Sequence, residues 1–359
     1  MKPLTATMSS PDTISARSSS GGPPSGLSQL ARQRWSANNP PSDPTVSFAG
    51  KTVLVTGANT GLGFEAAVKF ARLGASRLIL AVRTPSKGEE AKARILQATG
   101  REDDFITILQ VDLAEFESVK AFIRVLEEET DHLDVALLNA GLGNPTYVKS
   151  PLGWEMAVQV NVLSTALMAV LLLPLLRVAA RPGQTLPHLT FVNSHGHSMA
   201  EREWIGEDGS LLQAATSEPG WDAKKSYMMV KLLGISVMLA LAEATAPTPG
   251  EIAKPQIIVN AVCPDLCKTD LGRNFGLVSK ILMVPFQALF ARTAEQGSRS
   301  LVSATALSPE SHGQFWHHDI LEPLGNLAQD EKLLQQSWSE ILDVISEAQP
   351  DLQQILDNI

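Results

Sequence analysis

The amino-acid sequence predicts an α/β fold built on one doubly wound, parallel β-sheet with helices on both faces. From residue 51 onward, short runs of apolar or β-branched residues alternate with longer segments of helical periodicity. The short runs lack the in-and-out alternation of a half-exposed sheet, as expected of strands that helices cover on both sides. This strand–helix alternation favours right-handed crossovers and therefore a parallel sheet.

Six strands and five helices make up the predicted core. The strands are expected at Thr52–Thr56, Arg77–Val82, Phe105–Val111, Val135–Leu138, His188–Asn193 and Gln256–Val262. The helices are expected at Phe64–Leu73, Ser86–Gln97, Glu115–Glu128, Trp154–Ala179 and Ala223–Ala244. The carboxyl ends of the strands then share one edge of the sheet, where open α/β sheets bind their ligands.

The chain divides into a tail, a core domain and a helical extension. Residues 1–47 hold eleven serines and only two acidic residues, a composition that does not fold alone. This tail is expected to be disordered, apart from a short helix over Leu27–Trp35 that docks on the core. Such a tail also resembles a mitochondrial presequence, although its prolines break any long amphipathic helix. The core domain is expected over 48–325 and the extension over 326–359.

A lid is expected over residues 270–292. Its apolar stretch Leu277–Phe290 is interrupted by Pro285 and fits a substrate lid, a partner surface or a buried helix. In the extension, Glu331–Ile345 has the periodicity of an amphipathic helix that closes the fold.

Composition bears on partners and location. The formal net charge is −9, and no long basic run suits a nucleic-acid backbone. The two cysteines, Cys263 and Cys267, are too close to staple a domain and lack the further ligands of a zinc site. They indicate reduced thiols and a cytoplasmic location. The longest apolar run, Val162–Leu176, is shorter than the roughly 20 residues of a transmembrane helix.

A glycine-rich turn follows the first predicted strand, and a helix begins directly after it. Glycines let backbone amides approach a pyrophosphate, which then faces the positive end of the helix. The sequence therefore predicts a dinucleotide site that includes Gly57, Asn59, Gly61, Leu62 and Gly63.

Arg83 ends the second strand, twenty residues past Gly63. A carboxylate at this place would bind the ribose 2′-hydroxyl of NAD(H), whereas an arginine can fork onto a 2′-phosphate. No acidic residue lies nearer than Glu89, and Lys87 offers a second cation. The sequence therefore favours NADP(H) over NAD(H).

Two further strand ends carry residues suited to a cofactor. Asp112 closes the third strand, where a carboxylate can accept a hydrogen bond from the adenine amino group. Asn139, Ala140 and Gly141 close the fourth strand. Because both strand ends lie at the predicted ligand-binding edge, their agreement carries more weight than either alone.

Tyr227 and Lys231 are four residues apart within a predicted helix. Positions i and i+4 share one helix face, so the phenol and the ammonium reach the same small volume. A free tyrosine has a pKa of about 10, and a nearby cation is needed to stabilise its phenolate near neutrality. Lowering that pKa by roughly three units takes about 4 kcal/mol, which Lys231 and an oxidised nicotinamide ring can supply together.

Ser194 ends the fifth strand, where its hydroxyl is placed to donate to a developing alkoxide while Tyr227 exchanges the proton. Asn161, on the long helix after the fourth strand, is placed to hold a water that links Lys231 to solvent.

His195 and His197 follow this serine and raise the alternatives of a metal site or a hydrolase. Two histidines two residues apart are too few ligands for zinc unless distant groups join them. The Gly-x-Ser-x-Gly turn of a hydrolase does not surround the serine. The sequence therefore predicts no metal site.

In combination, these motifs resemble the short-chain dehydrogenase/reductase family. The resemblance spans roughly residues 50–323, and the wording of the glycine turn, the strand end at Arg83 and the segment 313–316 look like the retinol-dehydrogenase-like branch. The tail and the stretch 260–271 are similar to fungal members that often serve secondary-metabolite pathways.

The resemblance implies a single Rossmann domain that binds NADP(H). It implies catalytic roles for Asn161, Ser194, Tyr227 and Lys231, of which the last two also contact the cofactor. It implies further cofactor contacts for Cys267 and Thr269, after the sixth strand. It also implies a homodimer paired through the helices that carry Asn161 and Tyr227.

The chain departs from the family pattern after the sixth strand. The family usually has Pro-Gly there, where this sequence has Pro264-Asp265. A carboxylate near the nicotinamide would alter cofactor affinity or the backbone of the loop. Val230 also replaces the serine that is common before the lysine.

The leading hypothesis is an NADP(H)-dependent oxidoreductase that interconverts a ketone or aldehyde and an alcohol on a small molecule. The substrate is expected to be apolar, because the expected lid is rich in Leu, Val, Met and Phe. One alternative is a cofactor-binding scaffold or sensor without turnover, which Asp265 motivates. Another is an epimerase or dehydratase of the extended relatives, which share the tyrosine–lysine pair but normally space the glycine turn as TGxxGxxG.

Overall fold

An eight-stranded sheet forms the centre of the molecule in a computed structural model, which describes residues 13–14, 22–181, 185–206, 209–247, 255–269 and 277–359. The strand order is β3-β2-β1-β4-β5-β6-β7-β8. The strands are β1 Thr52–Thr56, β2 Arg77–Val82, β3 Ile106–Gln110, β4 Val135–Leu138, β5 His188–Val192, β6 Ile258–Val262, β7 Phe315–His317 and β8 Ile320–Glu322. Neighbours from β3 to β7 pair in parallel, and β8 runs antiparallel to β7. The predicted α/β class is confirmed.

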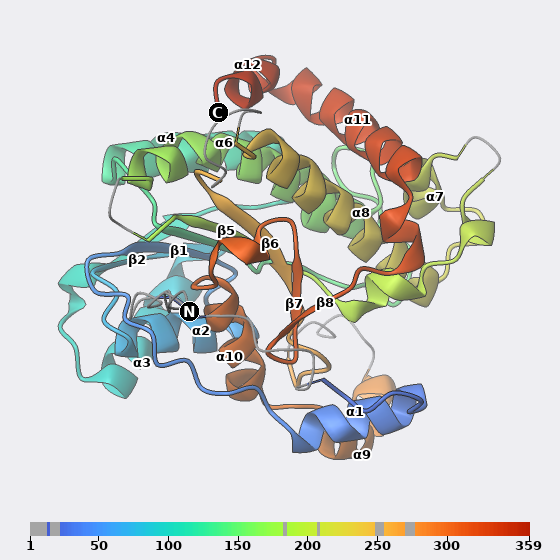
Figure 1. Cartoon of the computed structure of the whole chain (residues 1–359), viewed down its shortest axis with the longest axis horizontal. Coiled ribbons are helices and arrows are strands. Elements are labelled where there is room, and N and C mark those ends of the chain that lie inside the picture. Colours follow the sequence, from blue (N-terminus) through green and yellow to red (C-terminus); the bar gives the residue numbers. More distant parts are fainter. Residues whose placement is uncertain (1–12, 15–21, 182–184, 207–208, 248–254, 270–276) are drawn as a thin grey trace, which may run out of the picture.

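Helices cover both faces of the sheet (Figure 1). One face carries α2 Gly61–Arg72, α3 Pro85–Thr99 and α10 Ala294–Ala304, and the other carries α4 Phe116–Glu129, α6 Ser164–Ala179, α8 Ala223–Ala244 and α11 Glu331–Ala348. Successive strand side chains enter different hydrophobic cores. Leu54 belongs to the core under α4, α6 and α8, whereas Val53 and Val55 belong to the core under α2 and α10. Burial on both faces explains the continuous apolar runs in the sequence.

The predicted strands lie within two residues of their observed bounds, but shorter features differ from expectation. Strands β7 and β8 were not predicted, because three residues each are too few for a periodic pattern. The helix expected over Trp154–Ala179 is divided into α5 Met156–Val158, a π-helical turn η3 at Gln159–Leu163, and α6. Such turns are frequent at functional sites, and η3 carries Asn161.

Two helical segments are long and apolar enough to cross a bilayer by length and composition. They span Met156–Ala179 and Ala223–Ala244, and 78% and 61% of their most apolar windows are buried inside the molecule. Both segments lie against the sheet in Figure 1. A helix that is buried in the core of a protein is apolar for that reason as well.

The C-terminal helices lie over the surface that the family resemblance assigns to pairing. Helix α11 packs on α8, and α12 Leu352–Asp357 packs on α6. Leu333, Ile341 and Leu352 of this extension are buried in the same core as those two helices. The C-terminal helices therefore cover part of the surface of α6 and α8, and the homodimer that the resemblance implies stays a prediction.

The N-terminal segment packs against residues far along the chain. Helix α1 spans Gln29–Asn38, so it begins two residues and ends three residues later than expected, and it lies beside α9 Leu277–Phe290. Arg34 Nη1 donates to the Leu289 carbonyl at 2.6 Å. Residues 270–276 of the predicted lid lie outside the described residues.

Phe48, just before β1, anchors the start of the core domain. Its side chain is 1% exposed and its ring meets the Phe70 ring edge-on at 4.9 Å. Phe48→Ala is expected to lower the free energy of unfolding by about 3–5 kcal/mol, because a buried aromatic leaves a cavity. Denaturant unfolding measures this, with Leu30→Ala on α1, where the side chain is 56% exposed, as the control. Equal losses in the two variants would contradict the prediction.

Candidate active site

The glycine-rich turn closes tightly between β1 and α2. Gly57 and Gly61 have φ of 67° and 58°, in the left-handed region that favours glycine. A methyl group at Gly63 would lie 2.4 Å from Asn139 Nδ2 and 2.5 Å from the Gly57 carbonyl oxygen. Thr60, at the N-cap, gives α2 no side-chain cap. The turn and the first amides of α2 therefore fit the pyrophosphate of a dinucleotide.

Thr56 ties the end of β1 to the end of β4. Its hydroxyl accepts hydrogen bonds from the backbone amides of Asn139 and Ala140, both at 2.9 Å. The Asn139 side chain donates in return to the Thr56 carbonyl at 2.9 Å. The structure thus brings the predicted Asn139 and Ala140 onto the glycine turn. Thr56 was not among the predicted site residues.

Arg83 and Asp112 lie at the same edge of the sheet, after β2 and β3. Arg83 is exposed, and its carbonyl accepts from Gln110 Nε2 at 3.2 Å. Asp112 Oδ1 accepts from the Ala114 amide at 3.0 Å, and the Asp112 amide donates to Ser118 Oγ at 2.9 Å. Asp112 therefore shapes its own turn as well as standing where the adenine contact is expected.

Tyr227 and Lys231 lie on one face of α8, beside the end of β5. Lys231 Nζ lies 5.8 Å from the centre of the Tyr227 ring and donates to the Val192 carbonyl at 3.2 Å. Burial raises the pKa of Tyr227 to about 12, although a hydrogen bond with Ser194 opposes the rise. Burial also lowers the pKa of Lys231 to about 8.

The tyrosine shift reflects the chain's own residues, and burial among them has the largest effect on the pKa of Tyr227. The expectation that Lys231 and an oxidised nicotinamide ring together lower this pKa stays a prediction. With desolvation dominating, the Tyr227 phenol holds its proton at neutral pH. A protonated phenol is suited to donate its proton to a substrate carbonyl oxygen, which becomes more basic as the carbonyl is reduced.

Asn193 joins the serine to the helix of the tyrosine. Its Oδ1 accepts from the Ser194 amide at 2.7 Å, and its Nδ2 donates to the Lys231 carbonyl at 3.1 Å. A methyl group at Gly196 would lie 3.2 Å from Tyr227 Cε1, and the Gly196 amide donates to Ser194 Oγ at 3.1 Å. Ser194 and Tyr227 are therefore neighbours, as predicted. Asn193 and Gly196 were not assigned from the sequence, where they look like ordinary strand-end residues.

Asn161 projects from the π-helical turn toward the end of β4. Its Oδ1 accepts from the Leu142 amide at 2.9 Å, and its Nδ2 donates to the Leu142 carbonyl at 2.8 Å. Asn161 and Lys231 line a cavity of about 20 Å³, which suits one water molecule. A cavity of this size fits the predicted water between these two side chains.

The segment 263–269 after β6, which we call the β6 loop, reaches over the glycine turn. The Thr269 Cβ would be 3.6 Å from a methyl group placed on Gly61. Cys267 instead packs against Gly297 of α10, and its thiol donates to the Pro264 carbonyl at 3.3 Å. Burial raises the pKa of this thiol. The cofactor contact predicted for Cys267 stays a prediction, and its side chain faces α10.

Sequence comparison matches residues 51–186 to the family described as short chain dehydrogenase. The chain is also 43% identical over 332 residues to the short-chain dehydrogenase/reductase ffsI of Aspergillus flavipes, which covers 92% of this chain and 96% of that protein. The chain belongs to the short-chain dehydrogenase/reductase family. The enzyme phmF of Phaeosphaeria nodorum is similar to the same degree and over the same shares.

Two solved structures share the fold of this chain. The Pseudomonas aeruginosa RhlG/NADP complex superposes with a TM-score of 0.56 at 22% identity, over 76% of this chain and 96% of that one. The L-sorbose reductase of Gluconobacter frateurii, complexed with NADPH and L-sorbose, has a TM-score of 0.57 at 19% identity, over 76% and 97%. At these identities the likeness establishes the Rossmann-type architecture of this short-chain dehydrogenase/reductase.

Proposed function

We propose that this short-chain dehydrogenase/reductase uses NADP(H) to interconvert a ketone or aldehyde and an alcohol on an apolar small molecule. The observation that carries the proposal is the convergence of Ser194, Tyr227 and Lys231 beside the glycine turn. The residues come from β5 and α8, and the turn from β1 and α2, so the fold itself assembles them.

The side chains divide the chemistry among themselves. When bound, the cofactor supplies or accepts the hydride. Tyr227, protonated because its pKa is about 12, donates its proton to the carbonyl oxygen during reduction. Ser194 holds that oxygen by a hydrogen bond. Lys231 and Asn161 line the same small cavity. A water in this cavity can return a proton toward Tyr227 by way of Lys231.

Arg83 supports NADP(H) as the cofactor. Its exposed guanidinium stands at the end of β2, where a 2′-phosphate is expected. Structural relatives that were solved with NADP or NADPH are consistent with this choice. The similarity to fungal short-chain dehydrogenases supports a role in secondary-metabolite biosynthesis, and we propose a cytoplasmic location.

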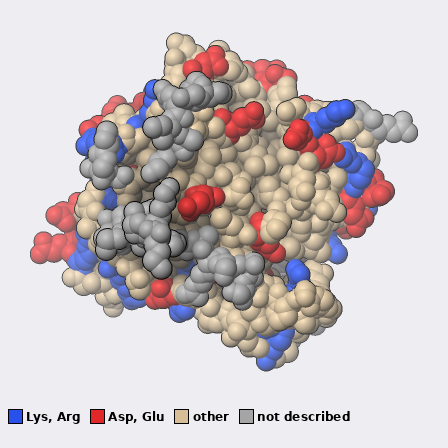
Figure 2. Space-filling model, in the orientation of Figure 1, with Lys and Arg blue, Asp and Glu red and all other residues tan. Residues whose placement is uncertain are grey.

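Charge on the surface supports a small-molecule substrate rather than a nucleic acid. On the face shown in Figure 2, basic and acidic side chains are interspersed, and no broad basic surface extends across it. The net charge of −9 also opposes binding to phosphate backbones.

The proposal is tested by incubating the purified protein with NADPH and a panel of apolar ketones and aldehydes, and with NADP⁺ and the matching alcohols. Turnover is expected for at least one class, followed by NADPH absorbance. Intact NADPH binding without turnover across both panels would favour a scaffold or sensor. Failure to bind either NADPH or NADH would remove the basis of the proposal.

A further inference from the structure

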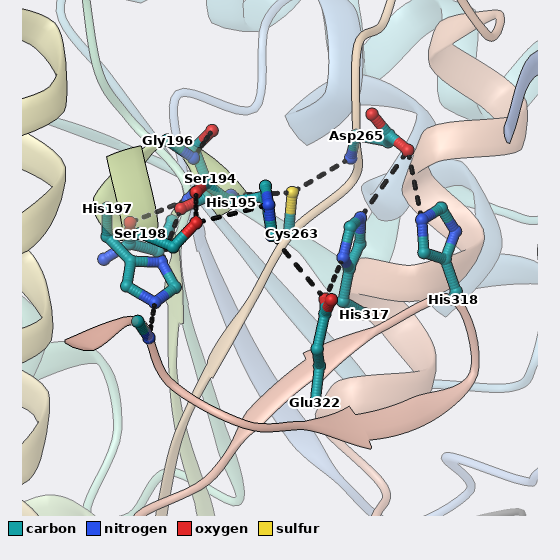
Figure 3. A network of polar contacts seen from close by, with 12 residues as sticks. Ser194, His195, Gly196, His197, Ser198, Cys263, Asp265, His317, His318 and Glu322 are labelled. Atoms are coloured by element: carbon teal, nitrogen blue, oxygen red, sulfur yellow. Dashed lines mark hydrogen bonds and ion pairs between the residues drawn. The ribbon is translucent and has the colours of Figure 1, made fainter. Parts of the chain in front are cut away.

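A partly buried cluster of histidines and carboxylates lies beside the candidate active site (Figure 3). It joins His195, next to Ser194, with Asp265 of the β6 loop and with His317, His318 and Glu322 of the β7–β8 hairpin. His317 donates from Nδ1 to Glu322, and its Nε2 lies 3.6 Å from Asp265 Oδ2. His195 Nδ1 lies 3.8 Å from Glu322 Oε2. One imidazole is thus held between two carboxylates.

The hydrogen bonds of His318 fix its charge state. Arg292 Nη2 lies 3.0 Å from His318 Nδ1, and a guanidinium can only donate. His318 Nδ1 therefore accepts, and its proton is on Nε2, which lies 3.3 Å from Asp265 Oδ2. Burial holds the pKa of His318 at about 3, so it is neutral. Asp265 and Glu322 are then balanced by Arg292 and a protonated His317.

Two groups of three side chains in the cluster, His195, His317 and Glu322 and then Asp265, His317 and His318, bring candidate metal ligands within 4.8 Å of one another. A metal lies in the plane of each imidazole that binds it, since the nitrogen lone pair lies in that plane. The rings of His195 and His317 are inclined by only 27°, with centres 5.7 Å apart, and those of His317 and His318 by 29° at 3.7 Å. Stacked rings direct their lone pairs side by side rather than toward one point. The arrangement instead fits ion pairs, in which His317 Nδ1 donates a hydrogen bond to Glu322 while its Nε2 lies 3.6 Å from Asp265 without a hydrogen-bond partner.

Asp265 shapes the β6 loop through both its backbone and its side chain. Its φ is 66°, a conformation that favours glycine, and its Oδ1 accepts from the Leu266 amide at 2.7 Å. The opposite side of the loop is tied to Arg292, whose amide donates to the Leu266 carbonyl at 2.8 Å. The loop ends at Thr269, above Gly61 of the glycine turn. Fixing Asp265 therefore fixes the segment that covers the cofactor site.

We propose that Asp265 is a positioning residue for the cofactor: its ion pair with His317, backed by Glu322, holds the β6 loop over the glycine turn and makes cofactor affinity depend on pH. The inference rests on the proposed function, because it assumes that NADP(H) binds beneath this loop. Where the family has Pro-Gly, the freedom of the glycine backbone shapes this loop. In this chain, the charged side chain of Asp265 shapes it instead.

The direction of the pH dependence follows from the charge of His317. Burial alone would lower its pKa, but Cys263, Asp265 and Glu322 outweigh burial and hold the pKa well above its usual value. The ion pair is therefore complete near neutral pH and is lost as the pH rises through this raised pKa. The groups that face His317 across the cluster are Cys263, Asp265, Glu322, His195, His197 and His318, with Arg292 behind His318.

The test compares wild type with Asp265→Asn, which keeps the shape of the side chain and tolerates the left-handed backbone but removes the charge. Dissociation constants for NADPH are measured by fluorescence titration from neutral to alkaline pH, together with kcat and KM. Asp104→Asn removes an exposed carboxylate before β3 and controls for a change of net charge. Asp265→Gly removes the side chain while allowing the same backbone.

Wild type is expected to bind NADPH more weakly as His317 loses its proton. Asp265→Asn should bind about tenfold more weakly at neutral pH, because the buried, charged His317 then loses one of its two carboxylate partners. Its affinity should no longer fall as the pH rises, because no ion pair between residue 265 and His317 is left to lose, and its KM for NADPH should change more than its kcat. Asp265→Gly should lose the pH dependence in the same way, so a folding defect in one variant leaves the other informative.

Identical affinities and pH profiles in wild type and both variants would overturn the inference. Wild type that binds neither NADPH nor NADH would instead overturn the proposed function, so the two failures are distinguishable.

Discussion

Tyr227→Phe is expected to lower kcat for carbonyl reduction by about 10²–10⁴-fold, which is the usual contribution of a general acid. The change removes one oxygen from a partly buried ring and leaves the Lys231 contacts to β5 and Asn193 in place. NADPH affinity should therefore be retained. Stopped-flow or steady-state turnover measures the loss, and fluorescence titration measures the affinity.

The chain provides a matched control, since it has only two tyrosines. Tyr147 lies on the loop after β4, and its hydroxyl donates a hydrogen bond to the Thr216 carbonyl at 3.2 Å. Tyr147→Phe removes the same atom and should lose only the stability of one hydrogen bond, about 1 kcal/mol. Comparable kcat losses in the two variants, or full activity in Tyr227→Phe, would show that Tyr227 is not the proton donor.

Arg83→Glu is expected to reverse the cofactor preference. The wild-type guanidinium can form a charged, forked pair with the 2′-phosphate of NADPH. Replacing it with a carboxylate removes this pair and adds repulsion, so NADPH should bind about 10- to 100-fold more weakly, as the loss of a charged hydrogen bond predicts. NADH carries a 2′-hydroxyl instead, and its affinity should stay the same or improve. Titrations with both cofactors measure the preference.

Arg124→Glu serves as the control for this charge reversal. Arg124 is exposed on α4, on the other face of the sheet from α2 and α3. This variant makes the same change in net charge and should keep the wild-type preference. An Arg83→Glu variant that still preferred NADPH would assign the 2′-phosphate to another cation, with Lys87 the nearest along the chain.

The central part of the fold was predictable because its signals are local. Five residues in a row such as Thr52–Thr56 are buried, and the apolar run reports this directly. The glycine turn and the pair Tyr227 and Lys231 are equally local, since their geometry depends on one turn and one helix. Residues of this kind can be assigned from spacing alone.

Other features depend on contacts between distant segments, which spacing does not record. Asp265 was identified as a departure from the family pattern, and His195 as a histidine lacking partners. Their connection through His317 and Glu322 requires the β7–β8 hairpin, whose strands are too short to show a pattern. The sequence predicted a closing helix at Glu331–Ile345, which α11 confirms, but not that the C-terminal helices pack on α6 and α8, because periodicity shows which face is apolar and not what covers it.

The docking of α1 has a consequence for the order in which the protein is completed during its synthesis. Arg34 meets the Leu289 carbonyl across 255 residues of chain, and Arg292 donates to the Ser36 carbonyl across 256. At the usual speed of translation, α1 leaves the ribosome roughly 10 to 50 s before these partners. Helix α1, the earliest helix among the described residues, therefore docks only after most of the catalytic domain has emerged. In a nascent chain, its docking would mark the completion of α9 and of the segment that follows it.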